Sequence, residues 1–226
     1  MGLIRRCRTA LARHHRSRGF GIHSPSAYRF VTEVLRERCH YYAYDDIRAW
    51  RKRLMANGVR TTMSNHEAQS LFRVVNHFAP RHVWQVGVDG ILPIVTMLLC
   101  SSKLEVTVHD DPNKVATACD LLNEQFGWRV HLAEGISTMP DKPFVLVNAL
   151  PMGEADLELL RDTLKRWLTE SESVVILRNL HRAPAMKHLW HEAKAMMAYG
   201  HTFTNEKTAI LVARPGIPRQ DFFLWL

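Results

Sequence analysis

The hydrophobic pattern of the chain changes character about one third of the way along. Before this point apolar residues recur at helical spacing, in 27–39 and again in 67–78, where Leu71, Val75 and Phe78 share one face. After it, short β-branched segments alternate with helix-length segments. The pattern predicts strands at 82–88, 104–109, 129–133, 143–149, 173–178, 201–206 and 208–214, and a last short strand at 222–226.

Helices are predicted between the strands, at 93–101, 112–126, 154–168 and 184–199. Strands joined through helices imply right-handed crossovers and a parallel sheet. The last two strands meet at Lys207 with almost no linker, so they must pair as an antiparallel hairpin. We therefore expect an α/β, Rossmann-like fold with a mostly parallel seven-stranded sheet and an antiparallel C-terminal hairpin.

Residues 1–65 are expected to form a basic tail and a helical cap, and residues 66–226 the α/β domain. In the cap, Ser24 followed by Pro25 is typical of an N-cap and a first helical residue. Pro80 ends the helix that precedes the first strand.

The formal net charge is +8, and much of it belongs to the N-terminal tail. The first eighteen residues contain no acidic residue and six arginines, which are Arg5, Arg6, Arg8, Arg13, Arg16 and Arg18. This segment could dock on an anionic partner or a membrane surface, or simply pack as a short helix. Aromatic residues are not interleaved with the arginines, which disfavours nucleic acid as a partner. The sequence leaves the oligomeric state open, with a homodimer among the alternatives.

The N-terminus lacks the apolar segment of a secretory signal, and no apolar run approaches the roughly 20 residues that span a bilayer. The four cysteines are scattered without C-x-x-C spacing, which is typical of reduced thiols. We therefore expect a cytoplasmic protein.

Two regions resemble a bacterial group of class I S-adenosylmethionine-dependent methyltransferases that is related to the catechol-type O-methyltransferases. The first is Gly21-Ile22-His23-Ser24-Pro25 with the following Tyr28–Leu35 and Tyr41–Tyr44, which resembles their N-terminal cap. The second is the order of strands from Val83 to Arg214, with Leu180-His181 after the fifth strand. The resemblance implies the methyltransferase fold, S-adenosylmethionine as cofactor and methyl transfer to a small-molecule acceptor.

The resemblance places the cofactor against the turn after the first strand, where glycines let a ligand approach the backbone. Here that turn offers Gly87, Asp89 and Gly90. The motif of the group that the chain resembles is similar to E-x-G-x-x-x-G, which would place an acid where this chain has Gln85 and a glycine where it has Ile91. A tight turn without a ligand is the alternative.

At the end of the second strand the relatives carry an acid that accepts both ribose hydroxyls. The matching residue is His109, so Asp110 would serve only if the turn shifts by one residue; alternatively, Asp110 or Asp111 caps the next helix, which begins at Pro112. After the third strand, Ile136 falls where the relatives have an acid that meets adenine. Glu134 is a candidate substitute and Ile136 could still pack on the ring.

In the catechol-type relatives, acids after the fourth and fifth strands hold a divalent metal. This chain has Asn148 after the fourth strand and Arg178-Asn179 after the fifth. Two amides and a cation form a poor magnesium site, so we expect no metal.

Each of these differences from the motif removes a negative charge from the same edge of the sheet. The residues concerned are Gln85, His109, Ile136, Asn148 and Arg178. Two functions follow. The first is an active, metal-independent methyltransferase, with Gly87, Asp89, Gly90, Asp110, Glu134, Ile136 and Asn148 at the cofactor and His181 as a general base. The second is a catalytically degenerate relative that serves as a binding module. His181 could equally be a structural loop residue.

Overall fold

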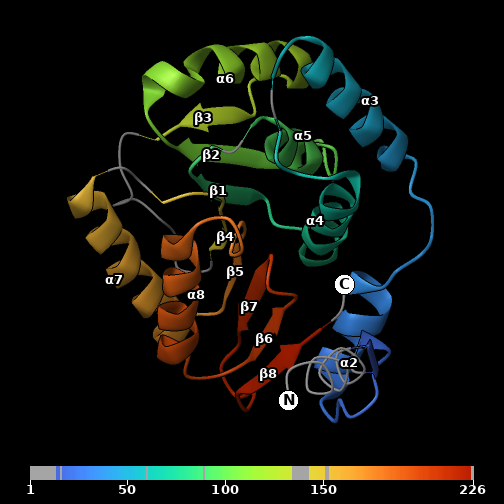
Figure 1. Cartoon of the computed structure of the whole chain (residues 1–226), viewed down its shortest axis with the longest axis vertical. Helices are drawn as coiled ribbons and strands as arrows, with labels where there is room; N and C mark the ends of the chain where they lie inside the picture. Colours follow the sequence, from blue (N-terminus) through green and yellow to red (C-terminus); the bar gives the residue numbers. More distant parts are fainter. Residues whose placement is uncertain are drawn as a thin grey trace, which may run out of the picture.

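The computed structural model describes residues 14–15, 17–59, 61–88, 90–133, 143–150 and 153–224. A twisted sheet with helices on both faces forms the body of the molecule; the short helix at Pro25–Arg29 lies near one edge of the sheet, and the helix at Ala43–Ala56 lies beside the helices of one face (Figure 1). The tail residues Arg5, Arg6, Arg8, Arg13 and Arg16, on which the docking hypothesis depends, lie outside the described part of the chain.

The strands lie in the order β3-β2-β1-β4-β5-β7-β6-β8. Their bounds are β1 His82–Val86, β2 Glu105–His109, β3 Val130–Leu132, β4 Phe144–Val147, β5 Ser173–Leu177, β6 His201–Thr204, β7 Ala209–Ala213 and β8 Gln220–Phe223. The first five pair in parallel, and β7 runs antiparallel to both β5 and β6. The predicted mixed sheet and its C-terminal hairpin are confirmed.

The described sheet has eight strands, the seven expected and the last short strand near the C-terminus. The eighth, β8, begins two residues earlier than predicted and pairs in parallel with β6, from His201↔Gln220 to Thr204↔Phe223. Phe222 of β8 stacks on Phe203 of β6, with ring centroids 5.3 Å apart. This apolar contact favours pairing at an edge that would otherwise expose unpaired backbone groups.

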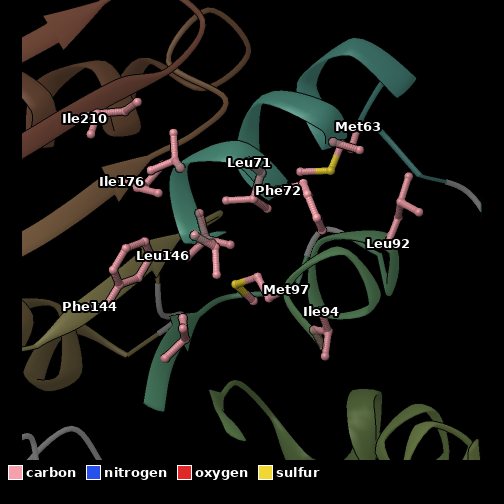
Figure 2. Close-up of a cluster of buried hydrophobic side chains, with 14 of the residues drawn as sticks. Met63, Leu71, Phe72, Leu92, Ile94, Met97, Phe144, Leu146, Ile176 and Ile210 are labelled. Atoms are coloured by element: carbon pink, nitrogen blue, oxygen red, sulfur yellow. The ribbon is translucent and has the colours of Figure 1, made fainter. Parts of the chain in front are cut away.

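The helices form two layers, with α7 and α8 on one face of the sheet and α4, α5 and α6 on the other (Figure 1). Their bounds are α2 Pro25–Arg29, α3 Ala43–Ala56, α4 Asn65–Phe78, α5 Leu92–Leu98, α6 Pro112–Phe126, α7 Glu154–Glu170 and α8 Pro184–Met196. Figure 2 shows how α4 and α5 reach the sheet, where Leu71 and Met97 lie near Leu146 and Ile176. Within the described chain, every helix is too short or too polar to traverse a lipid bilayer.

The single helix expected over 27–39 is instead two elements, α2 and a π-helix, η1, at Phe30–Leu35. As predicted, Ser24 caps α2, accepting a hydrogen bond from the Ala27 backbone. At the end of η1, the guanidinium of Arg73 in α4 donates to the backbone carbonyl oxygens of Val34 at 2.7 Å and Leu35 at 3.0 Å. A distant side chain therefore supports this conformation, which hydrophobic spacing does not encode.

Candidate functional site

The candidate site lies at the carboxyl ends of β1, β4 and β5. The strand order reverses between β1 and β4: from β1 the chain proceeds outward to β2 and β3, and from β4 it proceeds in the other direction to β5. This reversal is the topological switch point at which ligands bind in open α/β sheets. A cleft opens there, which we call the edge cleft; its lining includes Val88, Asn148, Ala149, Leu150, Asn179 and Arg182. A ligand-sized opening is therefore present beside the glycine turn.

The turn after β1 requires its glycines. Gly87 and Gly90 have φ values of +71° and +85°, in the left-handed region that favours glycine. A Cβ on Gly87 would lie 2.5 Å from the Ala149 carbonyl oxygen, so this glycine also permits close packing of the β1 turn on the β4 turn. Asp89, the third residue expected at the cofactor, lies outside the described residues.

The two acids after β2 have different roles. Asp111 is the N-cap of α6, because its carboxylate accepts a hydrogen bond from the Asn113 backbone at 3.0 Å. Asp110 instead turns toward β1, and its Oδ2 accepts from the Val88 backbone N–H at 2.6 Å. Of the two capping candidates, only Asp111 is the cap, and Asp110 presents a carboxylate at the glycine turn.

Two buried polar atoms near this turn have no hydrogen-bond partner in the described structure: Gln85 Oε1 and His109 Nδ1. Gln85 is fully buried, and its amide nitrogen lies 3.4 Å from the Gly87 carbonyl oxygen. Buried polar groups are rarely left unpaired, so such atoms beside a ligand cleft indicate groups that a ligand or water can satisfy.

Asn148 and Arg178 form a buried pair at the ends of β4 and β5, with exposures of 1% and 3%. The Arg178 guanidinium donates to Asn148 Oδ1 at 2.8 Å, and Asn148 Nδ2 donates to the Gly87 carbonyl at 3.3 Å. Asn179 Nδ2 donates to the Asn148 backbone carbonyl at 3.0 Å. Asn148 therefore connects the glycine turn with Arg178.

This donor set does not fit the divalent metal of the catechol-type relatives. The one side-chain oxygen of Asn148 already accepts from a guanidinium, whose positive charge repels a cation at that point. Within the described ranges, no group of three His, Cys, Asp or Glu side chains is arranged to hold a metal ion.

A second opening, the Arg178 pocket, lies on the other side of this pair, between α4 and the ends of β5, β6 and β7. Its lining is half apolar and half polar: Leu35, Leu71, Val74, Ile176, Phe203 and Ile210, with His66, Glu67, Ser70, Arg178, Asn205 and Thr208. Sequence reasoning placed α4 against the core but did not connect its N-terminus with a pocket.

Glu67 lies at the N-terminus of α4 and forms a capping box with Ser64. Its carboxylate accepts from the Ser64 backbone at 2.8 Å, while Ser64 Oγ accepts from the Glu67 backbone at 3.2 Å. Burial alone would raise the pKa of this carboxyl, but the bonds to Ser64 and the charges of Arg178 and Lys207 lower it overall. Glu67 is therefore an ionised capping residue. The spacing Ser64-x-x-Glu67 is the signal that would have found it in the sequence.

His181 is next in sequence to Arg182, which lines the edge cleft, but the lining of that cleft does not include His181 itself. It is exposed, accepts a hydrogen bond from Arg182 Nε at 3.3 Å, and lines a groove between α8 and the β6–β8 edge together with Trp190 and Phe223. In the described part of the chain, His181 lines this groove and Asn148 lines the edge cleft, and the role of His181 as a general base stays a prediction. Glu134 and Ile136 lie outside the described residues.

Comparison with solved structures finds the same architecture. A methyltransferase of Geobacter sulfurreducens superposes with a TM-score of 0.54 at 14% identity, over 86% of this chain and 98% of that one. An SAH-bound methyltransferase of Podospora anserina gives 0.53 at 11%, over 86% and 98%. An O-methyltransferase of Bacillus cereus in complex with SAH gives 0.53 at 14%, over 84% and 97%.

By sequence, the chain matches no family model. No curated protein matches it either. The likeness is therefore one of structure, and it agrees with the resemblance seen in the cap and in the order of strands. The chain has the class I methyltransferase fold.

Proposed function

We propose that the protein binds S-adenosylmethionine at the carboxyl edge of β1 and β2 and transfers its methyl group to a small-molecule acceptor without a divalent metal ion. When bound, S-adenosylmethionine supplies an electrophilic methyl group on a sulfonium centre. The observation that carries the proposal is the position of Asp110. Its carboxylate, at the end of β2, lies within 2.6 Å of the backbone of the glycine turn.

The residues around the turn would share the work of binding. Both oxygens of the Asp110 carboxylate accept a backbone hydrogen bond, Oδ2 from Val88 at 2.6 Å and Oδ1 from Asp111 at 2.7 Å, and each keeps a second lone pair for a hydroxyl of a vicinal diol. Gly90, with φ at +85°, would let the cofactor approach the backbone of the turn. Asn148 would hold the turn by donating to the Gly87 carbonyl. Catalysis would then consist mainly of positioning, since in-line methyl transfer needs donor and acceptor aligned.

Independence from metal follows from the Asn148–Arg178 pair. A guanidinium beside the only side-chain oxygen of Asn148 removes the position that a divalent cation would need. Cofactor affinity and methyl transfer are expected to be the same in excess EDTA as in millimolar magnesium.

The cofactor prediction is tested by calorimetric titration with S-adenosylmethionine and S-adenosylhomocysteine (SAH). We expect micromolar binding, reduced at least tenfold in Asp110→Asn, because the amide replaces an acceptor oxygen with a donor. Asp111→Asn is the matched control: asparagine also caps helices, so both α6 and the cofactor affinity should be preserved. Absence of heat at millimolar cofactor would refute the proposal.

A second function is favoured by the same buried pair. Arg178 places a positive charge on the edge where the relatives are expected to carry acids, which would suit a non-catalytic module that binds an anion. This candidate gains support if the protein binds no cofactor.

A further inference from the structure

The amino ends of β1, β2 and β3 form the edge of the sheet opposite the proposed cofactor site, and the segments around this edge are rich in cations. We call four of them, 50–53, 79–81, 100–104 and 126–129, the amino-edge surface. Together they contain no acid and six cationic residues, which are Arg51, Lys52, Arg53, Arg81, Lys103 and Arg129. Positive charge without an acid beside it in the chain favours an anionic partner.

Contacts between the loops make this surface continuous. Arg129 donates to the carbonyl oxygens of Ser101 at 2.6 Å and Leu104 at 3.3 Å, which joins the loops before β3 and β2. The loop before β1 lines a groove together with the loop before β2, and Arg81 and Lys103 both belong to its lining. In the described part of the chain, the side chains of Arg81 and Lys103 are exposed and have no hydrogen-bond or ion-pair partner. Two cations on this groove are therefore available to a ligand.

Aromatic rings alternate with the cations where the surface continues onto α3, which lies beside α6 (Figure 1). Trp50 of α3 stacks on Phe126 of α6, with ring centroids 5.6 Å apart. The Arg53 guanidinium lies 5.2 Å from the centre of the Trp50 ring, and that of Arg129 lies 5.6 Å from the centre of the Phe126 ring. Next in the chain, Trp128 is 77% exposed. A free indole therefore stands beside this row of rings and cations.

The position of Trp128 has no explanation in the packing of the fold. Its φ of +57° lies in the left-handed region, which bulky residues rarely adopt, and its ring gains almost no burial in return. Large aromatic side chains are normally mostly buried, because their burial contributes strongly to stability. An exposed ring on a strained backbone beside cations indicates a group that contacts a ligand.

This arrangement fits a single-stranded nucleic acid. Proteins that bind single strands combine cations along the phosphate backbone with aromatic rings on which unpaired bases stack. A membrane surface fits less well, since it is contacted by several apolar side chains in one plane. Trp128 is the one large exposed apolar side chain in these four described segments.

We propose that the amino-edge surface binds a single-stranded nucleic acid. A base stacks on Trp128, and backbone phosphates lie against Arg53, Arg81 and Lys103. The inference is independent of the proposed methyltransferase function, because the surface lies at the opposite edge of the sheet from Asp110. The N-terminal tail lacks aromatic residues among its arginines, whereas folding brings rings and cations together here from four separate segments.

The stacking contact is tested by fluorescence anisotropy on the full chain, with a labelled oligothymidylate of about 12 nucleotides at low salt. Trp128→Ala should weaken binding by about tenfold, while Trp128→Phe retains most of it because phenylalanine also stacks. Tyr42→Ala, at an 85% exposed aromatic residue before α3, is the matched control and should bind as the wild type does. Unchanged affinity in Trp128→Ala overturns the proposal.

The phosphate contacts are tested by the salt dependence of the same binding. The double variant Arg81→Gln/Lys103→Gln should reduce the slope of log affinity against log salt by about 1.4, since each phosphate contact on a single strand contributes about 0.7. Lys165→Gln/Lys187→Gln removes two exposed positive charges from α7 and α8 and is the control. An equal reduction in both double variants would mean that net charge alone drives binding, and would overturn the proposal.

The class of partner is tested by competition. The single strand should bind at least about tenfold more tightly than its duplex with oligoadenylate, because a base inside a duplex is not free to stack on Trp128. Equal affinity for the duplex, or binding to phosphatidylserine vesicles without binding to oligothymidylate, overturns the proposal. SAH titration keeps the two proposals separate: each of these variants should bind SAH as the wild type does, so loss of SAH binding in the wild type refutes the methyltransferase function alone.

Discussion

At the scale of single residues, Arg73 shows how one buried side chain stabilises the cap. It is 7% exposed and donates to the Val34 and Leu35 carbonyls of η1, to Tyr44 Oη and to Ser70 Oγ. Arg73→Leu would leave two buried carbonyl oxygens without these donors. We expect unfolding free energy to fall by about 3 kcal/mol, the cost of unsatisfied buried polar groups.

Urea denaturation followed by circular dichroism measures this loss. Arg38→Leu is the matched control, because Arg38 is exposed and donates to Glu37 through its backbone N–H. A change in Arg73→Leu no larger than that in Arg38→Leu would show that η1 does not depend on these bonds.

At the scale of elements, His201 joins the first helix of the cap to the sheet. Its Nε2 lies 3.0 Å from Ser24 Oγ and 3.2 Å from Ser26 Oγ, so β6 is linked directly to the N-terminus of α2. Burial lowers the pKa of His201 below 6.5, opposed in part by a hydrogen bond with the Gly200 backbone. The folded protein therefore resists a protonation that the unfolded chain accepts.

The sign of the pH dependence follows from this difference. The stabilising effect of a neutral His201 is complete above pH 6.5 and is lost as the pH falls from there toward the lower folded pKa. His77 and His82, whose pKa values are also lowered by burial, act in the same direction. Melting temperature should drop between pH 7.5 and 5.5, and by less in His201→Gln than in the wild type.

Differential scanning fluorimetry across this pH range provides the measurement. His23→Gln, at an exposed position near the same helix, should retain the full drop of the wild type. An identical pH profile for His201→Gln and wild type would rule out His201 as a source of the effect.

At the scale of the whole molecule, the cap and the sheet share one hydrophobic core. A single cluster of buried side chains includes Phe30 and Ile47 of the cap together with Val75 of α4 and Ile176 of β5. Phe30 lies with its ring centroid 4.8 Å from that of Phe203 in β6. Although the sequence divides at residue 65, we expect residues 17–59 and the α/β part to unfold in one cooperative step.

Hydrogen exchange with mass spectrometry in increasing urea tests this expectation. Protection of α3 and of β5 should be lost at the same urea concentration, and Phe30→Leu should lower both midpoints together. Loss of α3 protection at clearly lower urea would mean that the cap is a separate unit.

Local patterns account for what could be predicted. The bounds expected for the helix at 112–126 agree with α6, since its apolar spacing and the Asp111-Pro112 start are encoded within a few residues. The hairpin of β6 and β7 follows from the short connection at Lys207. The glycine turn and the absence of acids at Gln85, Asn148 and Arg178 could also be predicted from the sequence, because these positions lie at or near the ends of strands that the hydrophobic pattern identifies.

Other features depend on residues that are distant in the sequence. The conversion of a predicted α-helix into η1 is supported by Arg73, 38 residues beyond Leu35. The separation of Asp110 from the capping Asp111 needed the position of the β1 turn. The groove that His181 lines arises from how α8 crosses the β6–β8 edge.

The sequence by itself determined the succession of helices and strands, the cap of α2 and the loss of acids along one edge of the sheet, because each is set by residues close together in the chain. Tertiary structure alone decided that Arg178 donates to Asn148 and stands between the edge cleft and the apolar wall of α4. The physical reason is that the environment of a buried charge comes from segments far apart in the sequence, which only the folded sheet brings together.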